Sequence, residues 1–157
     1  NMTGRKAVQI KELTDLLLET DASTAEYIPN GKLFFTQLAD EWSYTLEDDF
    51  DCKVSIDNDL DFSGEFKVQE FQRIFDNLSS NIKKYANPSK PVILNVYKLD
   101  GRLVIEQSNY KAPKDNNVES HKIGLESIKR IANRHDGNIK ITENEEIFKI
   151  SITLFSI

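Results

Sequence analysis

The sequence is poor in several features that define common protein classes. Cys52 is the only cysteine, which excludes a disulfide within the chain and any metal site built from several cysteines, and is typical of a reducing compartment. No run approaches the roughly 20 apolar residues of a membrane-spanning helix, and the N-terminus has no apolar signal-peptide core, so we expect a soluble chain. Basic residues number 20 against 26 acidic ones, and the net charge of −6 argues against a nucleic-acid partner.

Core-forming residues, in contrast, are plentiful. The chain has 157 residues, of which 39% are hydrophobic, with nine Phe, five Tyr and one Trp. This length fits one folded domain with a real core and a short appendage, and the content of core-forming residues argues against disorder throughout the chain. Asn1 precedes Met2, which suggests a piece of a longer protein. The Pro29-Asn30-Gly31 run predicts a boundary near residue 28.

Hydrophobic periodicity predicts an alternation of helices and strands. Helices are expected over 5–24, 32–47, 67–86 and 124–135, and strands over 52–56, 60–62, 92–98, 103–107, 139–141 and 148–154. Asp100-Gly101 predicts a hairpin between two strands, and Gly137 is expected as a left-handed helix cap. A polar stretch over 108–122 predicts a loop of about 15 residues that could act as a lid. Together they predict an α+β two-layer sandwich, with helices on one face of a mixed, largely antiparallel sheet.

One helix carries polar side chains in a pattern that could perform chemistry. Asn77 and Asn81 are four residues apart and share a helical face, and Lys84 follows three residues later. Amide oxygens can ligate Mg²⁺, which takes further oxygens from water and substrate phosphates, and a lysine adds a charge for phosphate. By spacing alone, the alternative is an ordinary solvated helix edge.

The segment around these residues resembles the N box of sensor histidine kinases and related ATPases of the Bergerat (GHKL) type. Further pieces follow in the expected order: strands over 92–107 where the family has its adenine box, a polar loop where it has its ATP lid, and Lys122-Ile123-Gly124-Leu125, which is similar to a reduced glycine box. The resemblance implies a Bergerat-type sheet with three helices on one face, preceded by an N-terminal helix. Residues 1–28 are similar to the end of the dimerisation and phosphotransfer hairpin, which leaves 29–157 as the catalytic ATP-binding domain.

The resemblance also implies roles for individual residues. Asn81 matches the Mg²⁺-ligating Asn, and Asn77 matches the polar residue one turn earlier, so these two are the expected catalytic residues. The expected ATP-binding residues are Asn77, Asn81, Lys84, Tyr85, Gln107, Asn109, Lys122, Gly124 and Leu125. Gly124 would let the backbone approach phosphate, and the helix start would offer free N–H groups.

The sequence departs from the family pattern in two places. The adenine box lacks its Asp and the glycines after it: Gln107 is nearest the Asp position, and Asn109 is the other candidate. An amide oxygen can accept a hydrogen bond from the adenine amine, but more weakly than a carboxylate. The GxG before the last helix is also absent, and Gly124 alone of six glycines is left for phosphate.

The two histidines and one acidic run give little indication of a further functional site. His121 is an expected loop residue, which could touch a phosphate, and His135 an expected boundary residue compatible with a helix C-terminus. The acidic run over 57–61 lacks the Gly and Glu of a Ca²⁺ loop. No His precedes position 121, so the resemblance implies a phosphoacceptor outside this chain.

The resemblance implies a protein histidine kinase domain that uses ATP and Mg²⁺. It would transfer the γ-phosphate to a histidine of the phosphotransfer domain of the same protein, for relay to a response regulator. The full-length protein would be a homodimer in the cell membrane, with this domain in the cytoplasm. One alternative is a non-catalytic interaction module with a decayed nucleotide site, and another is an anti-sigma-type serine kinase.

Overall fold

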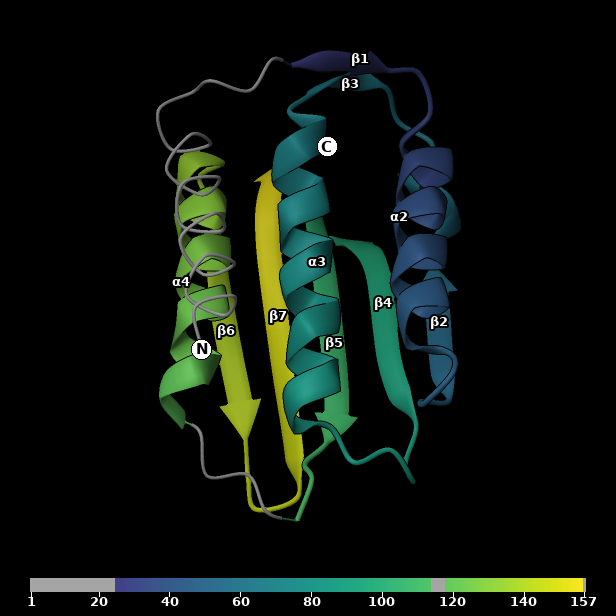
Figure 1. Ribbon diagram of the computed structural model, residues 1–157. Coiled ribbons are helices and arrows are strands. Elements are labelled where there is room, and N and C mark those ends of the chain that lie inside the picture. The colour runs from purple at the N-terminus through teal and green to yellow at the C-terminus, as the bar shows by residue number, and fades with distance from the viewer. Residues whose placement is uncertain (1–24, 114–117, 157) are drawn as a thin grey trace, which may run out of the picture.

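A computed structural model of the chain describes residues 25–113 and 118–156, with no side chains described for 118–124. Within these residues, three helices cover one face of a five-stranded sheet (Figure 1). The helices are α2 (Gly31–Leu46), α3 (Val68–Tyr85) and α4 (Val118–Arg134). The strands, in sheet order, are β2 (Cys52–Ile56), β4 (Val92–Leu99), β5 (Arg102–Tyr110), β7 (Ile147–Ser156) and β6 (Asn138–Glu143).

The predicted two-layer α+β architecture is confirmed. Every neighbouring pair in the large sheet is antiparallel except β2 and β4, which are parallel. Asp100 and Gly101 both have positive φ, 52° and 76°, as the predicted hairpin requires. A separate pair of short strands, β1 (Glu26–Ile28) and β3 (Gly64–Phe66), lies at one end of the molecule. The predicted helix over 5–24 falls outside the described residues.

The helices form where the apolar stripes predict them, except that α4 begins six residues earlier than expected. The Asn30 side chain caps α2 by accepting a hydrogen bond from the Leu33 N–H, at 3.1 Å. Trp42 of α2, Phe71 and Leu78 of α3 and Ile128 of α4 are all buried against the sheet, in one continuous core. No helix within the described residues is long and apolar enough to cross a membrane.

The expectation of a short strand over 60–62 is wrong. Residues Asn58–Leu60 form a 3₁₀ turn, with the Asp57 carboxylate accepting from the Asp59 N–H, and the Leu60 side chain is fully buried in the core. The partner of β2 is instead β4, which follows it through α3. A helix of this kind is what a parallel connection requires.

The expected loop over 108–122 is also shorter than the composition suggested. Strand β5 continues to Tyr110, because Asn109 pairs with both Val92 and Phe148 and the ladders therefore run on. Helix α4 begins at Val118, so Gly124 is its seventh residue and does not open the helix.

Gly137 is needed for a different reason from the one predicted. The left-handed residue after α4 is Asp136, with φ of 55°, while Gly137 donates its N–H to the Ala132 carbonyl at 2.8 Å. A Cβ at Gly137 would lie only 1.9 Å from the Thr153 carbonyl oxygen. The glycine therefore permits a close backbone approach to β7.

Candidate functional site

The polar residues predicted on α3 lie on the side of the helix that faces α4. A helix turns about 100° per residue, so Asn77 and Asn81, seven and eleven residues after Glu70, point within about 20° of its direction. Glu70 bonds directly to Arg134 of α4, which identifies this side. Asn77 is buried, Asn81 is half-buried and Lys84 is exposed near the end of the helix. The stripe thus runs from buried to exposed toward one end of the molecule.

Asn77 carries an unsatisfied polar atom. Its side chain is only 4% exposed, and its Nδ2 has no hydrogen-bond partner among the described residues. A buried amide N–H without a partner costs about 1–3 kcal/mol and is rare in native proteins. An unpaired donor on the stripe is therefore suited to an acceptor group of a ligand.

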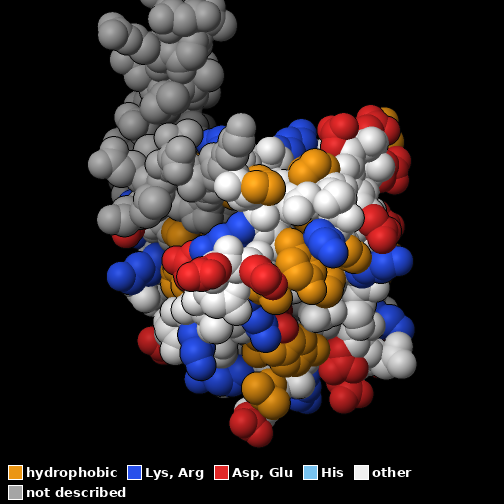
Figure 2. Space-filling view, turned by 90° about the horizontal axis from the view of Figure 1, so that it is seen from below, with side chains coloured by type: hydrophobic (Ala, Val, Ile, Leu, Met, Phe, Trp, Pro, Cys, Tyr) orange, Lys and Arg blue, Asp and Glu red, His pale blue; other side chains and the backbone are white. Residues whose placement is uncertain are grey.

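The C-terminal end of α3 is joined to the end of β5. Tyr85 accepts from the Ala112 N–H at 2.8 Å, Asn87 donates its N–H to the Tyr110 carbonyl at 2.8 Å, and Ala86 forms a bridge with Lys111. These backbone bonds bring the predicted Tyr85, which is buried, close to the strand that carries Gln107 and Asn109. Seen from this end, the surface has hydrophobic side chains bordered by charges of both signs (Figure 2).

Gln107 and Asn109, the two candidates for the adenine contact, have different surroundings. Both are buried and, two residues apart on β5, point to the same face of the sheet. The Gln107 Oε1 accepts a hydrogen bond from the Trp42 indole at 2.8 Å, and its Nε2 has no partner among the described residues. The Asn109 Nδ2 donates to the Tyr110 carbonyl at 3.0 Å. Gln107 thus bonds to α2, whereas the Asn109 amide is oriented by the Tyr110 carbonyl, which leaves the Asn109 Oδ1 as an acceptor.

The predicted residues of α4 can be placed only in part. Leu125 is half-buried and packs on the core. The side chains of Lys122 and His121 lie outside the described ones, and Gly124 is the seventh of the 17 residues of α4. Helix α4 begins at Val118, close in sequence to the end of β5.

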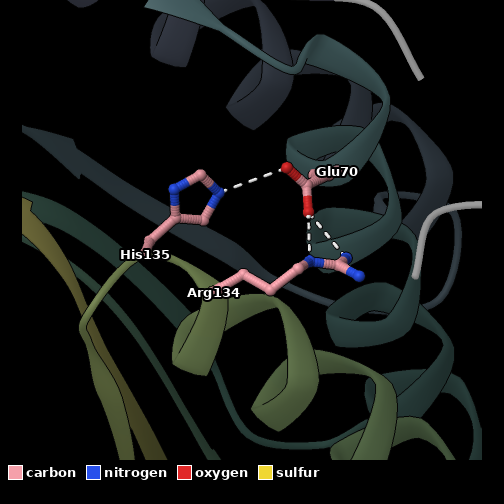
Figure 3. A network of polar contacts seen from close by, with 3 residues as sticks. All are labelled: Glu70, Arg134 and His135. Atoms are coloured by element: carbon pink, nitrogen blue, oxygen red, sulfur yellow. Dashed lines mark hydrogen bonds and ion pairs between the residues drawn. The ribbon is translucent and has the colours of Figure 1, made fainter. Parts of the chain in front are cut away.

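A buried ionic cluster on the same helices was missed by the sequence analysis. Glu70 has a side chain only 2% exposed, and its Oε2 accepts from Arg134 Nε at 3.1 Å and from Arg134 Nη2 at 2.6 Å (Figure 3). Its Oε1 lies 3.2 Å from His135 Nε2, which must carry a proton because an ionised carboxylate only accepts. His135, expected as a boundary residue, therefore also joins α4 to α3.

The cluster holds Glu70 in its charged form. Burial raises the pKa of the Glu70 carboxyl, but the hydrogen bond and charge of His135 and the charge and hydrogen bonds of Arg134 outweigh it, so the pKa lies below its ordinary value. The one sequence signal for this cluster is an acidic residue seven positions before Asn77, on a stripe whose neighbours Phe71 and Ile74 are apolar.

The donor set of the site fits a magnesium–phosphate ligand better than a protein-only metal centre. Among the described residues, no group of three or more His, Cys, Asp or Glu side chains could hold a metal ion. The stripe offers amide groups, which supply few ligands, and Mg²⁺ commonly completes its shell with waters and substrate phosphates.

A separate hollow of about 540 Å³ lies between α2 and α3, and its lining, which includes Asp40, Tyr44 and Asp76, contains none of the predicted site residues.

Comparisons with known proteins agree with this arrangement. The sequence model of one protein family, described as GHKL domain, matches residues 67–155. The sensor histidine kinase YrkQ of Bacillus subtilis (strain 168) is 26% identical over 151 residues, covering 91% of this chain and 34% of the relative. The chain thus spans about a third of the length of that curated relative.

Solved structures share the fold. The histidine kinase AdeS of Acinetobacter baumannii has a TM-score of 0.73 and 11% identity, over 99% of this chain and 81% of that chain. The catalytic domain of the histidine kinase ThkA, in a nucleotide-free form, has a TM-score of 0.61 and 15% identity, over 85% of this chain and 96% of that chain. At such identities the similarity establishes the fold alone.

Proposed function

Because the chain belongs to the GHKL domain family, whose ATPase members bind nucleotide, we propose that it is the ATP-binding catalytic part of a sensor histidine kinase. Residues 29–157 would form the catalytic domain, and residues 1–28 the end of a dimerisation and phosphotransfer hairpin. The observation that carries the proposal is the stripe of α3, where the buried Asn77 has an unpaired donor and Asn81 is accessible beside it.

We propose Asn109 for the adenine contact in preference to Gln107. The Gln107 Oε1 is already engaged by the Trp42 indole, so it would have to give up a buried bond in order to accept from the adenine amine. The bond from Asn109 Nδ2 to the Tyr110 carbonyl leaves the Asn109 Oδ1 as the acceptor. An amide in this orientation favours adenine, which donates there, over a base that presents a carbonyl oxygen.

The phosphates would lie along the exposed end of the stripe. Asn81 would ligate Mg²⁺ through its amide oxygen, Asn77 would donate to a phosphate oxygen, and Lys84 would add positive charge. Tyr85 would pack beside the nucleotide, and Lys122, Gly124 and Leu125 would close the site from α4. Bound Mg²⁺ would neutralise charge that develops on the phosphates during transfer.

The proposed reaction is transfer of the γ-phosphoryl group to a histidine outside this chain. The bond from phosphorus to the β–γ bridging oxygen breaks, a phosphorus–nitrogen bond forms on the imidazole, and ADP leaves. The protein contributes mainly positioning and charge stabilisation. The partners would be the phosphotransfer domain of the same protein and a response regulator, in a homodimer whose cytoplasmic part includes this domain and whose parent chain is membrane-bound.

Titration with a non-hydrolysable ATP analogue and Mg²⁺, followed by calorimetry, tests the binding step. We expect saturable binding, which Asn81→Ala removes in its Mg²⁺-dependent part while leaving the circular dichroism spectrum unchanged. Asn95→Ala, a change on β4 outside the site, is the matched control and should bind as the unaltered protein does. Unchanged Mg²⁺-dependent affinity in Asn81→Ala would overturn the metal assignment.

A non-catalytic interaction module with the same fold is the second candidate function. It is favoured by the absence of a carboxylate at the base-recognition position, where only Gln107 and Asn109 are available, and by the scarcity of glycine. No saturable binding at millimolar nucleotide would select this candidate and reject the kinase proposal.

A further inference from the structure

Glu70 stands at the head of the same stripe of α3 that carries the two asparagines. It precedes Asn77 by seven residues and Asn81 by eleven, so each of these two side chains leaves the helix within about 20° of the direction of Glu70. Its carboxylate receives two hydrogen bonds from Arg134, the last residue of α4, and lies 3.2 Å from the Nε2 of His135 just beyond (Figure 3). The face that presents the amides is therefore tied to α4 at the other end of the helix.

Asn77 has an unpaired donor that could gain a partner if the same helix were rotated slightly. Its Nδ2 is buried without a partner among the described residues, so a turn of α3 that brought this amide to water or to a backbone carbonyl would be favourable. The packing of residues such as Phe71 and Leu78 in the core keeps the apolar face of α3 on the sheet and limits such a turn to a small one. Charge-assisted bonds with a forked guanidinium are directional and can oppose it.

We propose that Glu70 is a positioning residue for the candidate nucleotide site. By binding Arg134 and His135, it fixes the rotation of α3 about its own axis and its spacing from α4, and this keeps Asn77 and Asn81 directed at the ligand. The inference rests on the proposed function of the α3 stripe, but the setting of the helix can be measured without nucleotide.

Distances between spin labels test the setting of the helix in the free protein. In a Cys52→Ser background, labels are attached at Lys83→Cys on α3 and Lys129→Cys on α4, both of which are exposed positions. Glu70→Gln keeps the size of the side chain and removes its charge, and we expect the label-to-label distance distribution to shift or broaden. Leu60→Ala, which opens the core beneath the 3₁₀ turn, is the control and should leave the distribution unchanged. An unchanged distribution in Glu70→Gln would overturn the proposal.

Nucleotide affinity tests the consequence for the site. Coupling through packed elements of this kind changes affinity by roughly two- to thirtyfold, so we expect Glu70→Gln to raise the Kd for the Mg²⁺–ATP analogue within that range. Leu60→Ala, measured at a temperature where all variants are folded, should keep the original Kd although it is less stable. Equal affinities in Glu70→Gln and the unaltered protein would reject a positioning role.

A second variant covers the case in which Glu70→Gln does not fold. The Arg134 side chain is 29% exposed, so Arg134→Gln is accommodated more easily and should raise the Kd and shift the label distances in the same way. If the unaltered protein binds no nucleotide, the proposed function fails and the label distances alone decide the role of Glu70.

Discussion

The Trp42 indole N–H donates to the Gln107 Oε1 at 2.8 Å, a bond between buried side chains 65 residues apart in the sequence. It joins α2 to the centre of the sheet and fixes which atom of the Gln107 amide is the acceptor. The remaining Nε2 has no partner among the described residues. The residue nearest the expected position of the family's adenine-binding Asp is thus part of the internal packing of the protein.

Trp42→Phe should lower the free energy of unfolding by about 1–3 kcal/mol, because it leaves the buried Gln107 amide with no partner among the described residues. Adding Gln107→Leu to Trp42→Phe should restore part of this loss, since both polar groups are then gone. Urea denaturation measures both effects. Nucleotide affinity should stay the same in the double variant, and a large loss would instead assign the base contact to Gln107.

The acid stability of the fold should depend on Glu70. Its pKa in the folded protein lies below the ordinary value of 4.5, so its contribution to stability is complete above about pH 4.5 and is lost as the pH falls through the lower, folded-state pKa. Glu70→Gln should be less stable than the unaltered protein at pH 7, by about 1–3 kcal/mol. The difference should shrink on acidification, and urea denaturation between pH 7 and pH 3 tests it. A difference that grew toward low pH would contradict the ionised state of Glu70.

Substitution by alanine should destabilise the protein at Gly137 and at Gly101, but for different reasons and by different amounts. At Gly137 a Cβ would meet the Thr153 carbonyl oxygen at 1.9 Å, so Gly137→Ala must separate the end of α4 from β7 and should cost about 3 kcal/mol or more. At Gly101 there is open space but φ is 76°, so Gly101→Ala should cost only the left-handed conformation, about 1–2 kcal/mol. Thermal denaturation of the two variants gives the comparison, and similar melting temperatures would contradict the steric explanation.

Local patterns were sufficient to predict most of the fold. The apolar stripe of α3 and the Asp100-Gly101 hairpin depend on neighbours in sequence, and both are confirmed. The strand expected over 60–62 was wrong because burial of Leu60 under α2 is a long-range effect, which a short apolar run cannot distinguish from a strand. Gly137 was identified as a special position, but its true constraint is the backbone of β7, which local sequence does not contain.

The candidate site also has features that local sequence predicts and features that it does not. The alignment of Asn77 and Asn81 follows from helical spacing alone, so it could be predicted. The engagement of Gln107 by Trp42 and of Glu70 by Arg134 joins residues more than 60 positions apart, and nothing in the local pattern selects those partners. The roles proposed for the site residues therefore remain predictions that binding experiments must test.

Asn109→Asp should strengthen nucleotide binding if Asn109 contacts the base. A carboxylate accepts a stronger hydrogen bond from the adenine amine than an amide does, so the Kd for the ATP analogue should fall by roughly tenfold, equivalent to about 1.4 kcal/mol. The change also removes the bond from Nδ2 to the Tyr110 carbonyl, so the free energy of unfolding must be measured beside the affinity.

Asn109→Leu, which has no acceptor, is the matched variant and should abolish binding. Gln107→Glu serves as the positional control: it places the same charge two residues earlier, beside Trp42, and should leave the Kd unchanged. Tighter binding in Gln107→Glu together with unchanged binding in Asn109→Asp would transfer the base contact to Gln107.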